Sequence, residues 1–505
     1  MAEVRVQAKG MEDSLAAEAQ LVGRLRWDTL AYGVALSVDR LVGLLLLPIL
    51  TGAWNQESFA AWCQIIVTMG FLSNVLLVGF YHSIVRYIPG AERDLVSKVF
   101  HGMLAIVLAN CALFLVVVTL NSRNLSTVLF ASAQLHGLVL PGSIFIVSEC
   151  LFEFVVLGFL RADGMISICA SYYAAKNLTR LVLLGYIAAK GIVHSLVVLL
   201  VANIFLTCIV YVLHIAPSLR SSSSKNLERG FWRRLMVYSL PIVVSSNFSW
   251  ANVSLNRFLI VHFLGLAELS VYAVNYSIAS IAHFVAMVVT FTFIPRMNTA
   301  WNLNDKAGVR RLLKMATEYY LFAALPIGLA VSLFYPQLLE MLTSPNYGSS
   351  RVLVVTLVCF MILLGFEQLL TFATLIQGSH FSLGARVLAL CINVLFNVVL
   401  IKSAGLIGSV IAGNMALATI VLLSARHLKD VVGYEFPWRE AGELLLAALA
   451  MLAAGVLLTA WPTFGSGLAL ILSVAVCGAV YLGAESLRTG SLCYAFLSAR
   501  KPSAI

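Results

Sequence analysis

Apolar stretches recur along almost the whole chain, and each is long enough to cross a membrane as an α-helix of about 20 residues. Hydrophobic residues make up 61% of the sequence and charged residues only 11%, unlike soluble domains. We therefore predict an all-α polytopic membrane protein with about 14 transmembrane helices. The predicted spans are residues 29–51, 59–80, 99–120, 138–160, 166–188, 193–213, 237–263, 269–293, 316–335, 352–377, 383–401, 405–425, 442–460 and 467–484.

The distribution of Lys and Arg predicts the orientation of these helices. Most of the 33 basic residues fall in the N-terminal tail, the even-numbered loops and the C-terminal tail. By the positive-inside rule both termini should be cytoplasmic, and the net charge of +10 reflects this skew. We therefore expect membrane lipids as neighbours and no nucleic-acid partner. No cleavage site follows the first apolar run, so we expect the first helix to remain as an anchor.

A serine-rich and then basic stretch, residues 217–234, separates two halves of the chain. Each half holds six predicted helices, so we divide the chain into lobes. The predicted segments are a cytoplasmic tail (1–28), an N-lobe (29–213), a cytoplasmic linker (214–234), a C-lobe (235–425), an appended helix pair (426–484) and a cytoplasmic tail (485–505).

Four pairs of identical residues, one member in each lobe, share a constant sequence offset. They are Glu153 with Glu367, Gly164 with Gly378, Gly191 with Gly405, and Ser195 with Ser409. Because each lobe has an even number of helices, two such copies would enter the membrane in the same direction. The pattern predicts a repeat whose axis runs along the membrane normal.

Five basic residues lie inside predicted spans: Arg40, Lys176, Arg180, Arg257 and Arg386. A charge near the bilayer centre costs at least about 2.5 kcal/mol, so such residues usually line a site or pathway. Arg40 and Arg257 occupy related places in the two lobes, and we predict that both bind phosphate oxygens. The alternative is that each belongs to a structural ion pair. Arg386 begins its span, and we expect its side chain to snorkel to the interface.

Lys176 and Arg180 share one face of a predicted helix, and Glu149 and Glu153 share a face of the preceding helix. Glu149 and Lys176 lie at similar distances from the turn between these helices and therefore at one depth. Two interpretations remain open. Either Lys176 and Arg180 bind substrate, or Glu149 and Lys176 form a structural ion pair that leaves Arg180 and Glu153 in need of partners.

Four acidic residues are candidates for coupling transport to an ion gradient: Glu367, Glu153, Glu149 and Asp39. A carboxyl group inside the membrane can bind and release a proton or Na⁺. For Glu367 the competing interpretation is a neutral acid that makes one interhelical hydrogen bond. The sequence contains no phosphate-binding glycine loop and no metal-ligand spacing, so we predict no enzyme activity, catalytic residue, cofactor or metal site.

Four segments of the chain are similar to a known transporter family. They are RLVGLLLLPILTGAWNQESFAAWCQ at 40–64, GFYHSIVRYIPG at 79–90, YSLPIVVSSNFSWANVSLNRFLIVHFLGLAELSVYAVNYSIAS at 238–280 and FIPRMN at 293–298. The sequence resembles the polysaccharide and oligosaccharide-lipid flippases of the multidrug/oligosaccharidyl-lipid/polysaccharide exporter superfamily. One departure is Asn256, because relatives often carry Asp before the arginine of this helix.

The resemblance implies a secondary-type transporter of the bacterial inner membrane. Such a protein flips an undecaprenyl-diphosphate-linked oligosaccharide, an exopolysaccharide or O-antigen repeat unit, from the cytoplasmic to the periplasmic leaflet by alternating access. The implied partners are this polyprenyl-diphosphate-linked glycan and a polysaccharide polymerase or export machinery. One alternative is a cation-coupled drug or metabolite antiporter of the same superfamily, for which Asp39 would be relevant. A membrane glycan ligase or polymerase is a further alternative, but the odd-numbered loops are short for one.

Overall fold

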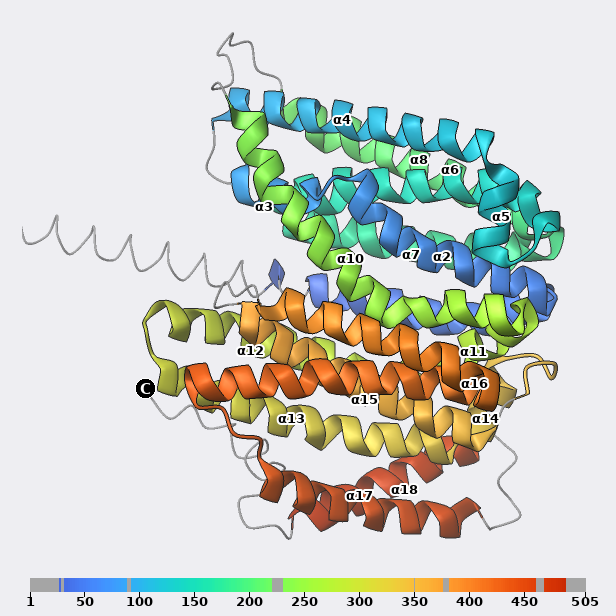
Figure 1. Cartoon of the computed structure of the whole chain (residues 1–505), viewed down its shortest axis with the longest axis vertical. Coiled ribbons are helices and arrows are strands. Elements are labelled where there is room, and N and C mark those ends of the chain that lie inside the picture. Colours follow the sequence, from blue (N-terminus) through green and yellow to red (C-terminus); the bar gives the residue numbers. More distant parts are fainter. Residues whose placement is uncertain are drawn as a thin grey trace, which may run out of the picture. The chain divides into compact units, whose positions relative to one another are not determined.

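The computed structural model describes residues 27–28, 31–88, 92–219, 230–348, 350–375, 381–459 and 467–486. All regular secondary structure in these ranges is helical (Figure 1), so the predicted all-α membrane fold is confirmed. Most of the predicted tails, residues 220–229 of the predicted linker and Gly378 lie outside the described residues.

The chain folds into two compact units. Unit 1 comprises Met1–Trp54, Ile65–Val128 and Ser132–Ser246, and unit 2 comprises Asn55–Gln64, Leu129–Ala131 and Asn247–Ile505. The division falls within the long helix α10 (Phe231–Leu264). The predicted lobe boundaries stay a prediction.

Unit 1 is built from long helices joined by short helical segments. Its elements before α10 are a first helix (Ala31–Ala53), α2 (Gln56–Leu76, shared with unit 2), α3 (Phe80–Tyr87), α4 (Arg93–Leu120), α5 (Ser122–Phe130, shared with unit 2), η1 (Ala133–Leu135), α6 (His136–Phe152), the π-helix η2 (Glu153–Leu160), α7 (Ile166–Ile187), η3 (Ala188–Lys190), α8 (Ile192–Val210), the π-helix η4 (Tyr211–Ile215) and α9 (Ala216–Ser218). Helix α6 is the most buried of these and packs against α4 and α8 (Figure 1).

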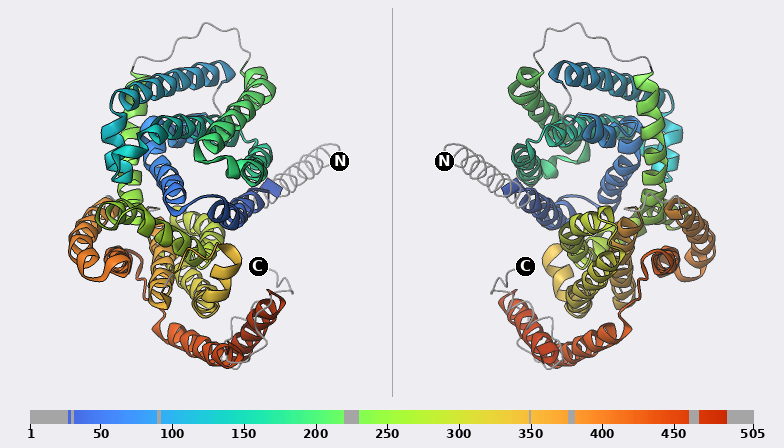
Figure 2. Two further views of the ribbon diagram at one scale, coloured as in Figure 1. Left: turned by 90° about the vertical axis from the view of Figure 1, so that its right-hand side faces the viewer. Right: turned by 90° about the vertical axis from the view of Figure 1, so that its left-hand side faces the viewer.

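Unit 2 contains the second part of α10 and the remaining helices. These are α11 (Leu266–Ala279), α12 (Phe284–Asn302), α13 (Lys306–Leu333), α14 (Tyr335–Leu342), α15 (Arg351–Leu375), α16 (Phe381–Val432), α17 (Trp438–Thr459) and α18 (Gly467–Ser486). Helices α17 and α18 pack together as a pair, and both views in Figure 2 show them side by side. Gly455 of α17 permits close packing, because a Cβ there would lie only 2.1 Å from Leu333 of α13.

Nine helices in the described ranges are long and apolar enough to span a membrane, or ten if one bent pair counts as a span. The long helix Leu383–Val432 covers two predicted spans and contains a break at Gly405. Helix α7 is long but carries Lys176 and Arg180, and it is not among the nine. The predicted number of about 14 spans therefore stays a prediction.

The structure adds a bend to one predicted span and moves the end of another. The span 269–293 is divided between α11 and α12, which meet at an angle of 49°. The span 59–80 ends at Leu76, where Val78 and Gly79 adopt φ angles of 53° and 69° before α3 begins. Left-handed backbone ends a right-handed helix, and hydropathy does not report such a break.

Gly191 and Gly405, which the sequence offset pairs, share a backbone feature. Their φ angles are 99° and 56°, and both lie where one apolar helical stretch gives way to the next. Glycine adopts such angles without the steric cost that other residues meet. The two glycines share a positive φ angle but differ in ψ, which is 167° at Gly191 and −133° at Gly405, and the repeat stays a prediction.

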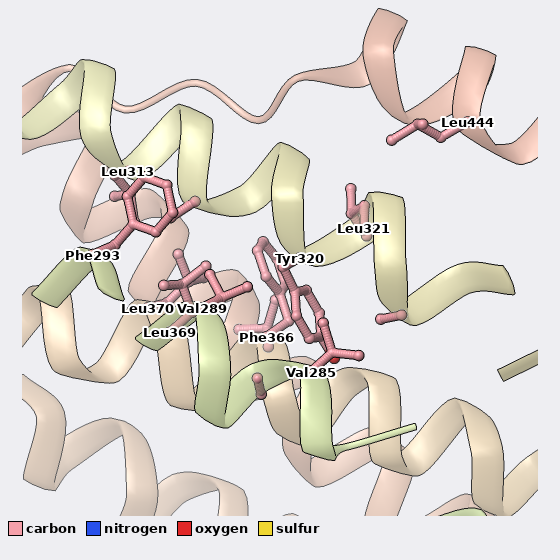
Figure 3. Packing of buried hydrophobic residues seen from close by; sticks show 14 of the residues in the cluster. Val285, Val289, Phe293, Leu313, Tyr320, Leu321, Phe366, Leu369, Leu370 and Leu444 are labelled. Carbon is pink, nitrogen blue, oxygen red and sulfur yellow. The ribbon is translucent and has the colours of Figure 1, made fainter. Parts of the chain in front are cut away.

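The core of unit 2 forms where α12, α13, α15 and α17 pack together. Figure 3 shows Val285, Val289 and Phe293 of α12 directed toward residues of α13 and α15. The rings of Tyr320 and Phe366 are stacked with centroids 6.5 Å apart. Tyr320 also donates a 2.7 Å hydrogen bond to the carbonyl of Ile362, so its buried hydroxyl has a partner.

Candidate functional site

Unit 1 contains a buried ionic group centred on Glu149 of α6. Lys176 Nζ lies 2.7 Å from Glu149 Oε2, and Arg180 Nη2 lies 2.6 Å from Oε1. The ion pair predicted as the structural alternative is therefore present. Arg180, for which the sequence suggested no partner, shares the same carboxylate because one helical turn separates it from Lys176.

Asn203 of α8 completes the surroundings of Glu149. Its Nδ2 donates a 2.8 Å hydrogen bond to Oε1, the oxygen that also accepts from Arg180. The ammonium of Lys176 lies 4.6 Å from the ring centroid of Phe152, a cation–π arrangement. Sequence reasoning missed Asn203. The sequence feature that could have identified Asn203 is its amide side chain in a very apolar helix, because such a group needs a polar partner.

Three further charged residues lie close to this group. Asp39 and Arg40 of the first helix both interact electrostatically with Tyr173 of α7, and Asp39 does so with Arg180. Glu153, the first residue of the π-helix η2, interacts with Lys176 and with the Ser73 hydroxyl. We call these residues the unit 1 charge cluster: Asp39, Arg40, Glu149, Glu153, Lys176 and Arg180.

The unit 1 charge cluster combines exposed and buried groups. The Arg40 side chain is exposed, whereas that of Glu149 is only 4% exposed. Lys176 and Arg180 are intermediate, with side chains 11% and 17% exposed. The cluster holds three basic and three acidic residues, so its net charge is zero when all are ionised and +1 when one carboxyl is protonated. The arrangement can change its charge by taking up a single proton.

Unit 2 holds a second pair of opposite charges. Arg386 Nη2 of α16 lies 4.0 Å from Glu367 Oε1 of α15, and the hydroxyl of Thr371 donates a 2.8 Å hydrogen bond to the same oxygen. Arg386 is only 6% exposed. The expectation that it snorkels to the interface is therefore wrong, because its guanidinium is turned toward the Glu367 carboxylate inside the unit.

Arg257 of α10 belongs to unit 2 and faces an aromatic ring. Its Cζ lies 4.5 Å from the ring centroid of Tyr276 in α11. Among the described residues it makes no ion pair with a carboxylate. A guanidinium on an aromatic face keeps its charge and donors for an anion. The predicted joint action of Arg40 and Arg257 stays a prediction.

A ladder of buried amides joins α10 to α16 in unit 2. Asn397 donates to Asn256 Oδ1 at 3.1 Å, and Asn393 donates to the carbonyl of Asn252 at 3.2 Å. Ser409 donates to Asn397 Oδ1 at 2.7 Å. Sequence reasoning treated Asn256 only as a departure from relatives. The available signal was the spacing of four between asparagines on each helix, which places them on one face.

The chain is similar to a curated flippase and to solved structures of membrane transporters. No protein-family model matches the sequence. A curated protein from Haloferax volcanii, described as probable low-salt glycan biosynthesis flippase Agl15, is 24% identical over 282 residues. That match covers 53% of this chain and 55% of the relative, so the chain spans about half the length of the curated relative that it matches.

Two solved structures share the fold. A lipid II flippase, MurJ, in an inward closed conformation superimposes with a TM-score of 0.71 at 15% identity, covering 93% of this chain and 100% of that one. An inward-facing multidrug resistance transporter of the MATE family gives a TM-score of 0.65 at 17% identity, covering 79% of this chain and 98% of that one. The resemblance that the sequence indicated is confirmed at the level of the fold.

Proposed function

Because the chain has the fold of the multidrug/oligosaccharidyl-lipid/polysaccharide exporter superfamily, we propose that it is a flippase for a diphosphate-linked lipid oligosaccharide. It would carry the glycan from the cytoplasmic to the periplasmic leaflet of a bacterial inner membrane by alternating access. Two similar proteins, the glycan biosynthesis flippase Agl15 and the lipid II flippase MurJ, support this substrate class.

The observation that carries the proposal is the sharing of one carboxylate, Glu149, by two cations. Within this trio one carboxylate faces two cations, and the remaining positive charge is balanced only through the neighbouring acids Asp39 and Glu153. Only Nη2 of Arg180 is engaged by a described residue, which leaves Nη1 and Nε to donate to a phosphate oxygen. A diphosphate is well suited to a guanidinium and an ammonium held one helical turn apart.

Proton uptake by Glu153 would couple a gradient to substrate binding. When Glu153 is ionised the unit 1 charge cluster is neutral, and when it is protonated the cluster carries a net charge of +1. The protonated cluster therefore attracts the diphosphate more strongly, and release of the proton weakens that attraction. Glu367 in unit 2, Asp39 and Glu149 remain further candidates for ion coupling.

The test uses the full-length protein in liposomes containing a fluorescent polyprenyl-diphosphate disaccharide, with accessibility of the label to an external quencher as the readout. We expect Lys176→Gln and Arg180→Gln each to slow transfer at least about tenfold, since a hydrogen bond to a charged group contributes roughly 1.5–3 kcal/mol. Lys190→Gln, at an exposed position on η3, is the control. Wild-type protein that moves no label under any imposed gradient would overturn the proposed function.

A cation-coupled drug or metabolite antiporter is the second candidate, because the fold match extends to a MATE family transporter. Glu367, an acid whose side chain is only 14% exposed, is the residue most suited to this role. Liposomes loaded with a cationic dye distinguish the two functions. Dye exchange driven by a proton or Na⁺ gradient, with no transfer of the lipid-linked disaccharide, would favour the antiporter.

A further inference from the structure

Arg161 of unit 1 contacts tyrosines and forms no ion pair with a described carboxylate; unlike Arg86, it also donates a hydrogen bond to a tyrosine hydroxyl. It follows directly after the π-helix η2, and its Nη1 donates a 3.2 Å hydrogen bond to the Tyr81 hydroxyl. Its Cζ lies 5.9 Å from the ring centroid of Tyr32 in the first helix. No ion pair joins Arg161 to a described acidic residue.

Two acidic residues of unit 1, Asp163 and Asp28, have partners other than Arg161, whereas Glu153 interacts electrostatically with Tyr81 and Tyr32. Asp163 pairs with Arg93 of α4, and Asp28 accepts a 2.5 Å hydrogen bond from Ser167 of α7. The exposed Arg161 therefore keeps its full positive charge. Four of its five N–H donors are unused by described residues.

Tyr81 and His82 add donors beside Arg161. Because the Tyr81 oxygen accepts from Arg161, its own O–H is left to donate to another group. Burial, together with the nearby charge of Arg161, lowers the pKa of His82. The ring is therefore neutral near pH 7 and offers one N–H. Its ring packs edge-on against Tyr81 with centroids 5.2 Å apart.

The backbone around these residues is held in a strained and specific shape. Val78 has a φ of 53°, which is unusual for a β-branched residue, and Gly79 follows with a φ of 69°. This break starts α3, which packs against η2. A 2.5 Å hydrogen bond between the hydroxyls of Ser83 and Ser239 holds α3 against α10. Backbone strain of this kind persists only where surrounding contacts hold the chain in place, and it is often found at functional sites.

We propose that Arg161, Tyr81 and His82 form a second anion site, separate from the unit 1 charge cluster, that binds the phosphate group of a lipid. A planar guanidinium with several free donors, a hydroxyl and an imidazole N–H match the oxygens of a phosphate ester. Two lipids supply this chemistry, the diphosphate-linked substrate and an anionic phospholipid. The first source rests on the proposed flippase function.

Binding to the full-length protein in phosphatidylcholine nanodiscs tests the site. The probe is a fluorescent short-chain prenyl diphosphate, followed by anisotropy. In a second arm, native mass spectrometry counts the phosphatidylglycerol molecules retained from nanodiscs that contain this lipid. We expect Arg161→Gln to weaken binding in at least one arm about tenfold or more, which is the loss of one charge-assisted hydrogen bond. Tyr81→Phe should weaken the same arm by a smaller factor.

Arg86→Gln is the matched control. Arg86 lies on α3, is exposed, and stacks on Tyr238 with its Cζ 4.3 Å from the ring centroid. The variant removes one charge from the same element, and we expect less than a twofold change. Equal losses in Arg86→Gln and Arg161→Gln, or unchanged binding in both arms for Arg161→Gln, would overturn the site. Binding is measured without transport, so a protein that binds through Arg161 but moves no lipid would overturn only the flippase proposal.

Discussion

Replacing Glu149 with Gln should be among the most destabilising single changes in unit 1. The carboxylate is 4% exposed and holds Lys176 at 2.7 Å and Arg180 at 2.6 Å. The variant keeps the shape and one acceptor oxygen but removes the only carboxylate that both cations contact directly, leaving them the more distant charges of Asp39 and Glu153. Removal of one partner from a buried ion pair costs about 3–5 kcal/mol, and the loss here concerns two pairs.

Replacing Lys176 with Gln should cost distinctly less than replacing Glu149. It leaves Glu149 paired with Arg180 and hydrogen-bonded to Asn203, so no charge loses its only partner. Replacing Asn203 with Leu should destabilise by an intermediate amount. It removes one hydrogen bond to a charged group, at a cost of roughly 1.5–3 kcal/mol. The expected order of destabilisation is Glu149→Gln, then Asn203→Leu, with Lys176→Gln the smallest.

The assay is reversible unfolding in mixed micelles of increasing sodium dodecyl sulfate, followed by circular dichroism, with the free energy of unfolding taken from the midpoint and slope. A Lys176→Gln variant that loses as much stability as Glu149→Gln would refute the reasoning. It would show that removing the carboxylate shared by two cations costs no more than removing one of those cations.

The remaining predictions concern backbone strain, the amide ladder and ion coupling. Gly79→Ala should destabilise by about 1–2 kcal/mol or more, since its φ is 69° and a Cβ would meet a main-chain oxygen at 2.9 Å; Gly43→Ala, with nothing within 4 Å, should not destabilise in the same unfolding assay. Asn397→Ala should cost roughly 2 kcal/mol or more by leaving buried amide partners unsatisfied, whereas exposed Ser403→Ala on the same helix should cost under about 0.5 kcal/mol. Glu367→Gln should remove the dependence of transport on an imposed ion gradient in liposomes, and retention of that dependence would exclude the coupling role.

Hydropathy was sufficient to predict the all-helical membrane fold, but it did not predict where individual helices bend or end. Within the predicted span 269–293, α11 and α12 are separated by a bend of 49° that hydropathy did not indicate. The helix of the predicted span 59–80 ends at Leu76, just before Val78 adopts a positive φ angle. A window average measures how apolar a segment is, whereas a helix break depends on a few φ and ψ angles that apolar residues do not specify.

The candidate site was predictable where geometry along one hairpin was enough. Glu149 and Lys176 lie on consecutive helices at equal distances from their turn, and equal depth is set by the rise per residue. Arg386 shows the limit of such reasoning. Its place near the start of a span suggested snorkelling, but Glu367 on the preceding helix α15 attracts it into unit 2.

By itself the sequence determined that the chain crosses a membrane as helices, where Lys and Arg concentrate, and which few charges must lie among apolar residues. These properties follow from composition and from the periodicity along one helix. The tertiary structure alone decided which charges neutralise one another and which stay available: Lys176 and Arg180 share Glu149, whereas Arg257 and Arg161 face tyrosines. The reason is physical, since the Coulomb energy of two charges depends on their separation in space and on local burial, and neither is set by separation along the chain.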